Sequence, residues 1–284
     1  MLPLEKFKKK SISVSDIASQ FWCEKKLELT YVYGKKISEE QKKGKELHEE
    51  LEREVEKIVD IEPINFADNL FIKFFNLLKS LEHLEREGIA REIPIFGSIE
   101  GFFITGQIDE IQKRNGKNFL VEVKTRANSL PAGEFFEKVI KVQLFLYKKL
   151  LEDSISGKFS LRNVTNFYGL KKLKISDEFE RQLKASGISE NDVFDVARQA
   201  YEKIMKIGEI SEMLEVKYVD QYTGKVIGRR GFRFDEEEFK KMIDFAMGYW
   251  KGKREALPVP REEIQKCLTC RFFGKECKFW YLKV

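Results

Sequence analysis

The chain has 284 residues, enough for one large domain or two small ones. Hydrophobic residues make up 42% and charged residues 35%, a composition typical of a globular protein and not of a disordered or membrane-spanning one. Lys and Arg number 52 against 47 Asp and Glu, and this mild excess of +5 permits nucleic-acid binding without arguing for it. No apolar run approaches the length of a membrane span, and the first residues lack the layout of a signal peptide, so we expect a cytoplasmic protein.

The first part of the chain predicts helices. Ser13 and Asp16 form the N-cap and capping-box positions of one helix. Residues 38–59 predict a charged amphipathic helix that carries His48, although a lone histidine is most often structural. A further helix is expected from Asn69 to Arg86, and residues 91–97 then predict a strand.

The stretch from Gly106 to Arg126 predicts a β-hairpin with a chemical centre. Asn115-Gly116 is the dipeptide preferred in tight two-residue hairpin turns. Asp109 then lies on one strand, while Glu122 and Lys124 lie on the next and share a face, because residues two apart on a strand point the same way.

Two acids and a lysine in this arrangement indicate hydrolysis of a phosphodiester. Carboxylates such as Asp109 and Glu122 can hold a hard divalent cation, with a histidine nitrogen as a further ligand. Lys124 can orient the attacking water or stabilise charge on phosphate oxygens. The acid, gap, acid-x-lysine pattern is short and arises by chance, so its weight depends on the hairpin around it.

A helix from about Glu134 to Leu151 should follow this hairpin. Gln143 and Tyr147 lie four apart on its apolar stripe, and the glutamine either bonds a nearby carbonyl or supports the centre. Residues 152–212 show mixed strand and helix signals, with one helix expected from Glu190 to Lys206.

A second hairpin is predicted between Leu214–Val219 and Lys225–Phe234. Its return strand carries three arginines that form either a phosphate-contact patch or a solvated charged face: Arg229, Arg230 and Arg233. A helix from Glu236 to Trp250 follows. No internal repeat or low-complexity linker divides the chain, so we expect one closed domain.

Four cysteines lie at the two ends of the chain, Cys23 near one end and Cys267, Cys270 and Cys277 near the other. In a reducing compartment this grouping favours a bound metal or cluster over disulfides. Tetrahedral zinc and a cubane iron–sulfur cluster both suit four thiolates, and the spacing does not separate them.

Taken together, these motifs resemble the exonuclease V family, a branch of the RecB-like PD-(D/E)XK nucleases that carry an iron–sulfur cluster. The resemblance spans residues 11–281 and rests on these segments: Ser13-Val14-Ser15-Asp16, Cys23-Glu24-Lys25-Lys26, His48, Gly106 with Asp109, Glu122-Val123-Lys124-Thr125-Arg126, Gln143 to Leu151, Tyr249 to Ala256, and the C-terminal cysteines.

The resemblance implies an α/β fold, with a restriction-endonuclease-like core of a central mixed sheet flanked by helices over about residues 88–151. Helical residues 11–87 would precede the core, and additions with an iron–sulfur segment over 152–284 would follow it. It implies Mg²⁺ or Mn²⁺ at His48, Asp109, Glu122 and the Val123 carbonyl, with Lys124, Gln143 and Tyr147 at the catalytic centre. It also implies a structural [4Fe-4S] cluster on Cys23, Cys267, Cys270 and Cys277.

The implied activity is exonucleolytic cleavage of single-stranded DNA in repair or replication, with Arg126 as a further candidate DNA contact and a single-strand-binding protein as a candidate partner. Three alternatives stay open at this point. One is the RecB-like nuclease of CRISPR adaptation, and another is a nucleic-acid-binding module with an inactive site. The third is a structural metal protein, or a subunit that a partner activates.

Overall fold

The computed structural model describes the chain except residues 37–38, 40–41, 44–45, 47–60, 128–132 and 279–284. Its described strands form one six-stranded mixed sheet in the order β1-β3-β4-β5-β6, with β2 also paired to β3. These strands are β1 (Ile12–Ser13), β2 (Ile89–Ile99), β3 (Phe102–Arg114), β4 (Lys117–Arg126), β5 (Met213–Asp220) and β6 (Val226–Arg233). The predicted α/β fold with a central mixed sheet is confirmed.

The two predicted hairpins are both present. Asn115 and Gly116 join β3 to β4 with φ of 50° and 79°, which are the positive values that a primed two-residue turn requires. Strand β5 pairs in parallel with β4 and antiparallel with β6. The sheet therefore extends beyond the core predicted at residues 88–151, because β5 and β6 add to its edge.

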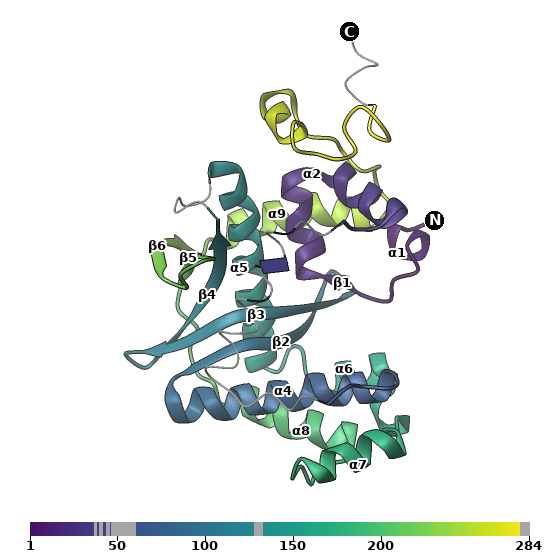
Figure 1. Cartoon of the computed structure of the whole chain (residues 1–284), viewed down its shortest axis with the longest axis vertical. Coiled ribbons are helices and arrows are strands. Elements are labelled where there is room, and N and C mark those ends of the chain that lie inside the picture. The colour runs from purple at the N-terminus through teal and green to yellow at the C-terminus, as the bar shows by residue number, and fades with distance from the viewer. Residues whose placement is uncertain (37–38, 40–41, 44–45, 47–60, 128–132, 279–284) are drawn as a thin grey trace.

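Helices cover both faces of this sheet (Figure 1). On one side lie α2 (Val14–Tyr33), α5 (Glu134–Ile155) and α9 (Glu236–Trp250), near the short α1 (Pro3–Lys6). On the other lie α4 (Phe66–Glu87), α6 (Leu161–Tyr168), α7 (Asp177–Ala185) and α8 (Val193–Ile204), with the 3₁₀ turn η1 (Leu170–Lys172). A second 3₁₀ segment, η2 (Arg261–Cys267), leads into the C-terminal cysteines.

The helix starts follow the capping chemistry of the sequence. The Ser13 hydroxyl accepts a hydrogen bond from the Asp16 N–H at 3.0 Å, and the Asp16 carboxylate accepts one from the Ser13 N–H, so the predicted capping box is present. The helix expected from Glu190 to Lys206 is confirmed as α8, which packs against α4. The strand signals in residues 152–212 are corrected, because this segment forms helices and no strand. The predicted helix over 38–59 lies almost entirely outside the described residues.

Helix α5 approaches the sheet closely because two glycines leave room for it. A Cβ at Gly97 would lie 2.3 Å from a methyl of Leu150, and one at Gly106 would lie 2.8 Å from the ring of Tyr147. No real side chain tolerates such distances, so larger residues here would push α5 away from β2 and β3.

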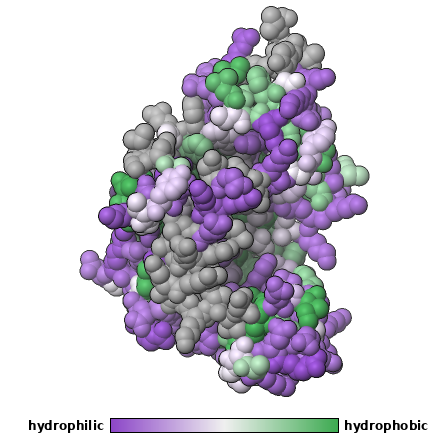
Figure 2. All heavy atoms as spheres, in the orientation of Figure 1, coloured by the Kyte–Doolittle hydropathy of each residue, from purple (hydrophilic) through white to green (hydrophobic). Residues whose placement is uncertain are grey.

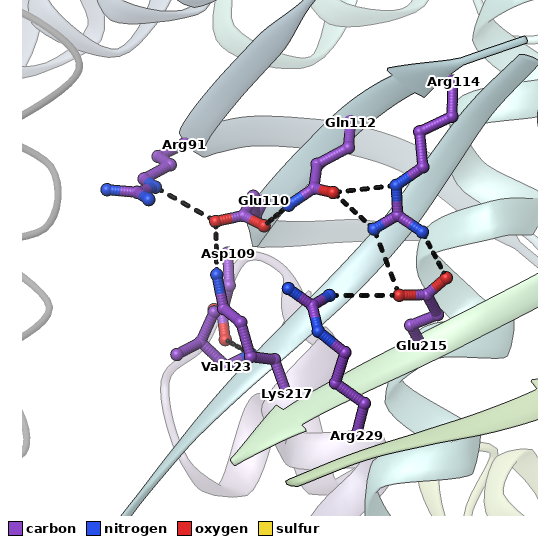
Figure 3. Close-up of polar contacts among 9 residues, drawn as sticks. All are labelled: Arg91, Asp109, Glu110, Gln112, Arg114, Val123, Glu215, Lys217 and Arg229. Carbon is purple, nitrogen blue, oxygen red and sulfur yellow. Dashed lines mark hydrogen bonds and ion pairs between the residues drawn. The ribbon is translucent and has the colours of Figure 1, made fainter. Parts of the chain in front are cut away.

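A network of ion pairs crosses the opposite face of β3, β5 and β2 (Figure 3). Glu110 is fully buried, and its Oε2 accepts bonds from Lys217 Nζ at 2.7 Å and Arg91 Nε at 3.0 Å. Burial opposes ionisation of Glu110, but Lys217 and Arg91 outweigh it, so its pKa is lowered. The network continues towards the sheet edge through Gln112, Arg114, Glu215 and Arg229.

Figure 2 shows a mainly hydrophilic face with several small apolar patches. Ile264 and Leu268 of the C-terminal segment are among the exposed apolar residues. Among the described residues, no helix is both long enough and apolar enough to cross a membrane.

Replacing Lys217 by Met should destabilise the fold by about 3 kcal/mol, because it removes one of the two cations that hold a buried carboxylate. Lys117→Met is the matched control, since Lys117 on β4 makes only an exposed ion pair with Glu209, and it should cost under about 1 kcal/mol. Urea unfolding followed by circular dichroism measures both, and equal losses would contradict a special role for the buried network.

Candidate active site

The predicted acids meet where β3 and β4 separate. Ladder pairing between these strands ends at Glu110–Val121. Beyond that point the Asp109 Oδ2 accepts a hydrogen bond from the backbone N–H of Val123 at 2.8 Å. This side-chain bond connects β3 to β4 where backbone pairing has ended. Glu122, one residue before Val123, is 1% exposed and forms an ion pair with Lys124.

The electrostatics place Lys124 and Tyr147 in the field of both acids. Burial disfavours the charged form of Lys124, but the Glu122 and Asp109 carboxylates outweigh this and raise its pKa. Burial, followed by the same two carboxylates, raises the pKa of Tyr147 well above its usual value. Gln143 donates to the Tyr147 hydroxyl at 3.2 Å. The structure thus brings together five predicted site residues: Asp109, Glu122, Lys124, Gln143 and Tyr147.

Strand alternation is broken once to allow this grouping. Gly106 points at Tyr147 of α5, whereas Glu110, four residues on, points to the opposite face and bonds Lys217. Positions four apart on a regular strand share a face, so the alternation must shift between them. The neighbouring strand shifts too, since Ile95 lies beside Gly106 and Arg91 bonds Glu110.

The paired positions on either side of the shift are Arg91–Glu110 and Ile93–Ile108. The shift therefore falls between them, at Glu92 on β2 and Asp109 on β3. Glu92 has a φ of 50°, a left-handed conformation that costs a residue with a side chain on the order of 1 kcal/mol. Its carbonyl accepts a bond from Gln107 Nε2 at 3.3 Å. The left-handed backbone at Glu92 therefore contributes to the shift that separates the two acids. The shift leaves Asp109 near Glu122 and Glu110 in the ion-pair network on the opposite face.

The acids have the donor chemistry of a magnesium site. Mg²⁺ is commonly held by one or two carboxylates, with waters and substrate phosphates completing its shell. Asp109 and Glu122 supply such a pair, and Val123 lies between Glu122 and Lys124 on the same strand. Within the described residues, no three or more His, Cys, Asp or Glu are placed to hold a metal ion. His48, the third predicted side-chain ligand, lies outside the described residues.

The four cysteines lie together, as the sequence predicts. All four line one cavity whose other walls include Trp22, Val259 and Phe272. Burial raises the pKa of the Cys23 thiol to about 11, and the other three cysteines add to the shift. Helix α2 leaves helical geometry at Cys23, where the backbone is extended, and the Lys26 N–H approaches the Cys23 sulfur at 3.4 Å. None of the four forms a disulfide.

Hydrogen bonds from α2 hold the C-terminal segment beside Cys23. The buried carboxylate of Glu24 forms an ion pair with Arg254 and accepts the Leu257 N–H at 3.0 Å. The Lys25 N–H donates to the Leu257 carbonyl at 2.9 Å. The residue after Cys23 therefore fixes the path by which the chain returns to the other three cysteines.

The predicted arginines differ in their surroundings. Arg229 and Arg230 already pair with carboxylates, Glu215 and Glu137 respectively, while Arg233 is exposed on the edge strand. Arg126 instead lies over two aromatic rings, with its guanidinium carbon 5.5 Å from the Phe136 centroid and 5.4 Å from that of Tyr218.

Comparison with known proteins identifies the relatives of this chain. The family model described as "Exonuclease V - a 5' deoxyribonuclease" matches residues 2–120, 112–208 and 196–281. The chain belongs to the exonuclease V family. Exonuclease V of Danio rerio is 29% identical over 286 aligned residues, which cover 95% of this chain and 71% of that protein.

A shorter match is to the mitochondrial exonuclease V of Candida dubliniensis, 29% identical over 66 residues, or 23% of this chain and 10% of that protein. The solved structure "Crystal structure of SSO0001" aligns with a TM-score of 0.39 at 13% identity, over 93% of this chain and 84% of that one. Membership in exonuclease V confirms the predicted family and enzyme class, a deoxyribonuclease whose substrate is DNA.

Residue type gave little or no sign of the structural roles of three residues around this candidate site. Glu92 lies in the strand predicted at residues 91–97, and its left-handed backbone has no signal in residue type. Gly106 offered one signal, a glycine inside a strand, which often marks the close approach of another element. Lys217 reads as an ordinary charged strand residue, although it is buried.

Glu92→Gly should leave DNA cleavage unchanged. Its free energy of unfolding should stay the same or rise by up to about 1 kcal/mol, because glycine adopts a positive φ without strain. Glu92→Val should lose at least about tenfold in cleavage and about 1–2 kcal/mol in stability, since a β-branched residue resists this conformation. The measurements are turnover of labelled DNA and urea unfolding for each variant. Loss of cleavage in Glu92→Gly would show that the carboxylate matters rather than the backbone.

Proposed function

We propose that this protein is a metal-dependent exonuclease that hydrolyses single-stranded DNA from 5′ ends, in DNA repair or replication. The observation that carries the proposal is the cluster of Asp109, Glu122 and Lys124 at the β3–β4 divergence, in a chain of the exonuclease V family. The family description supplies the 5′ end, which the sequence alone does not predict.

The site residues divide between binding the metal and moving the water. In this proposal Asp109, Glu122, the Val123 carbonyl and His48 hold Mg²⁺ or Mn²⁺, on a PD-(D/E)XK core whose catalytic hairpin is β3–β4. A cation held by these residues would supply charge neutralisation for the phosphodiester and activation of a water. Lys124 leaves its ion pair with Glu122 to hold the attacking water or the developing negative charge.

Gln143 and Tyr147 position this centre from α5. The Tyr147 hydroxyl receives bonds from Gln143 and the Gln107 backbone, and its high pKa keeps it a neutral hydrogen-bond donor beside two carboxylates. Its ring packs over Gly106, so the phenol is fixed to the strand that carries Asp109.

The cysteine cavity is proposed to hold a [4Fe-4S] cluster. A cubane spreads its four thiolates around several irons, whereas zinc draws them to one point. The four cysteines line one cavity together with Trp22, Val259 and Phe272, which leaves room for a group larger than a single ion. This arrangement supports the cluster over zinc. Its role is to join α2 to the C-terminal segment.

Asp109→Asn and Lys124→Ala should each reduce Mg²⁺-dependent cleavage at least about 100-fold, because the first removes a proposed metal-binding carboxylate and the second removes the amine that holds the attacking water or the developing charge. The assay compares 5′-labelled linear strands with circular strands, in Mg²⁺ or chelator. Linear strands should be shortened from the 5′ end in Mg²⁺ only, and circular strands should persist.

Lys117→Ala is the matched control for Lys124→Ala, since it removes an exposed lysine from the same strand and should retain activity. Full activity in Asp109→Asn or Lys124→Ala would overturn the assigned site. Cleavage of circular strands would overturn the exonuclease assignment.

Cys270→Ser should release the cluster and lower the thermal midpoint, because a serine oxygen is a poor ligand for iron in place of a thiolate. Anaerobic purification followed by iron, sulfide and zinc analysis measures the loss directly. Lys124→Ala should keep the full iron and sulfide content of the wild type. Stoichiometric zinc without sulfide in the wild-type protein would refute the cluster.

A further inference from the structure

A partly exposed aromatic surface connects the catalytic strand to the cysteine cavity. Phe136, in the first turn of α5, is 46% exposed, and its ring contacts that of Trp22 on α2 with a centroid distance of 4.5 Å. Trp22 immediately precedes Cys23 and lines the cysteine cavity. In Figure 1 the N-terminal end of α5 lies near α2 and the C-terminal segment.

Arg126 joins this surface to the active site. It lies two residues beyond Lys124 on β4, so the two side chains leave the strand on the same side. Its guanidinium packs between Phe136 and Tyr218. Among the described residues its buried Nε has no hydrogen-bond partner, and burial lowers the pKa of the guanidinium.

This environment distinguishes Arg126 from the other arginines of the sheet. Arg91, Arg114, Arg229 and Arg230 each form an ion pair with a glutamate, and Arg233 is exposed at the sheet edge. A partly buried cation with an unused donor gains most from an anion that arrives with the substrate. A planar guanidinium held on aromatic rings is suited to a phosphate, which it can contact with two parallel N–H groups.

Further positive charge flanks the aromatic pair. Lys26 lies 5.7 Å from the Trp22 ring centroid, and the exposed Lys138 lies 5.6 Å from that of the neighbouring Phe21. Aromatic faces bordered by cations are the usual means of binding single-stranded nucleic acid, because every base offers a face for stacking and every linkage a negative charge.

We propose that Arg126, Phe136 and Trp22 form a binding site for one nucleotide of single-stranded DNA next to the scissile linkage. Arg126 binds the backbone phosphate, and Phe136, supported from behind by Trp22, stacks against the base. The strand then runs from the carboxylates of β3 and β4 past α2 towards the cysteine segment. This inference rests on the proposed function and extends it by naming where the strand lies outside the catalytic centre.

The test measures binding of a fluorescent oligonucleotide to the full-length protein in chelator, where no cleavage occurs. Phe136→Leu should weaken binding about tenfold, whereas Phe136→Tyr should bind like the wild type, since stacking needs an aromatic face. Phe66→Leu is the matched control, because Phe66 is 52% exposed on α4, beside Tyr168, and should not change affinity.

A second measurement identifies what Phe136 contacts. An oligonucleotide scanned with single abasic sites should lose affinity for the wild type at one position near the 5′ end, and Phe136→Leu should lose that sensitivity. Arg126→Gln should reduce the slope of log affinity against log salt by about 0.7, the value for one phosphate contact on a single strand.

The outcomes separate this inference from the proposed function. If the wild type neither binds nor shortens single strands, the proposed function fails. If it does both, and Phe136→Leu binds all oligonucleotides like the wild type, only the nucleotide site is wrong. An unchanged salt slope in Arg126→Gln would likewise remove the phosphate contact.

Discussion

The active site depends on one break in the alternation of side chains along β2 and β3. Neighbouring residues on a regular strand, such as Asp109 and Glu110, point to opposite faces. Residues four apart point to the same face, so regular alternation would place Glu110 on the α5 side with Gly106. The shift at Glu92 and Asp109 reverses this beyond residue 108. Asp109 then meets the end of β4, and Glu110 is bonded from the far side by Lys217 and Arg91. Two adjacent acids thus acquire a chemical and a structural role.

The far-side network limits how freely Asp109 can move. Glu110 is tied to β2 through Arg91 and to β5 through Lys217, so three strands are fixed at the residue next to Asp109. On the near side, Tyr147 lies against Gly106. In the proposed function, a carboxylate between these two supports would need little reorganisation to bind a cation and a phosphate, which is the condition for effective electrostatic catalysis.

The sequence predicted the features that depend on local chemistry. The Asn115-Gly116 turn, the Ser13–Asp16 capping box and the Gln143–Tyr147 pair each follow from residue type and spacing, and the structure contains all three. The joining of Cys23 to the C-terminal cysteines followed from the rarity of cysteine in the chain. In contrast, within residues 152–212 local pattern assigned only the helix from Glu190 to Lys206, which the structure contains as α8. The shorter helices before it gave mixed signals, because short amphipathic helices resemble strands until their packing partners are known.

What the sequence could not supply is the choice of partner for each charge. The sequence left Arg229 and Arg230 as either a phosphate-contact patch or a solvated charged face, and in the structure they pair with Glu215 and Glu137. Lys217 gave no sign of burial, because a lysine enters a core only when a carboxylate such as Glu110 meets it there, 107 positions away. Such pairings are properties of the fold, and no periodicity of one strand reveals them.

Trp22 connects the cysteine cavity to the aromatic surface beside the carboxylates, because it adjoins Cys23 and contacts Phe136. At this point α2 leaves helical geometry, so the orientation of Trp22 is set by whatever holds Cys23 as well as by the helix. Trp22 in turn supports Phe136, whose ring carries Arg126 at the end of the catalytic strand. A group bound by the cysteines, as proposed, would therefore do more than join the chain ends. It would also fix the aromatic surface that lies between the cysteine cavity and the carboxylates, along which the proposed strand path runs.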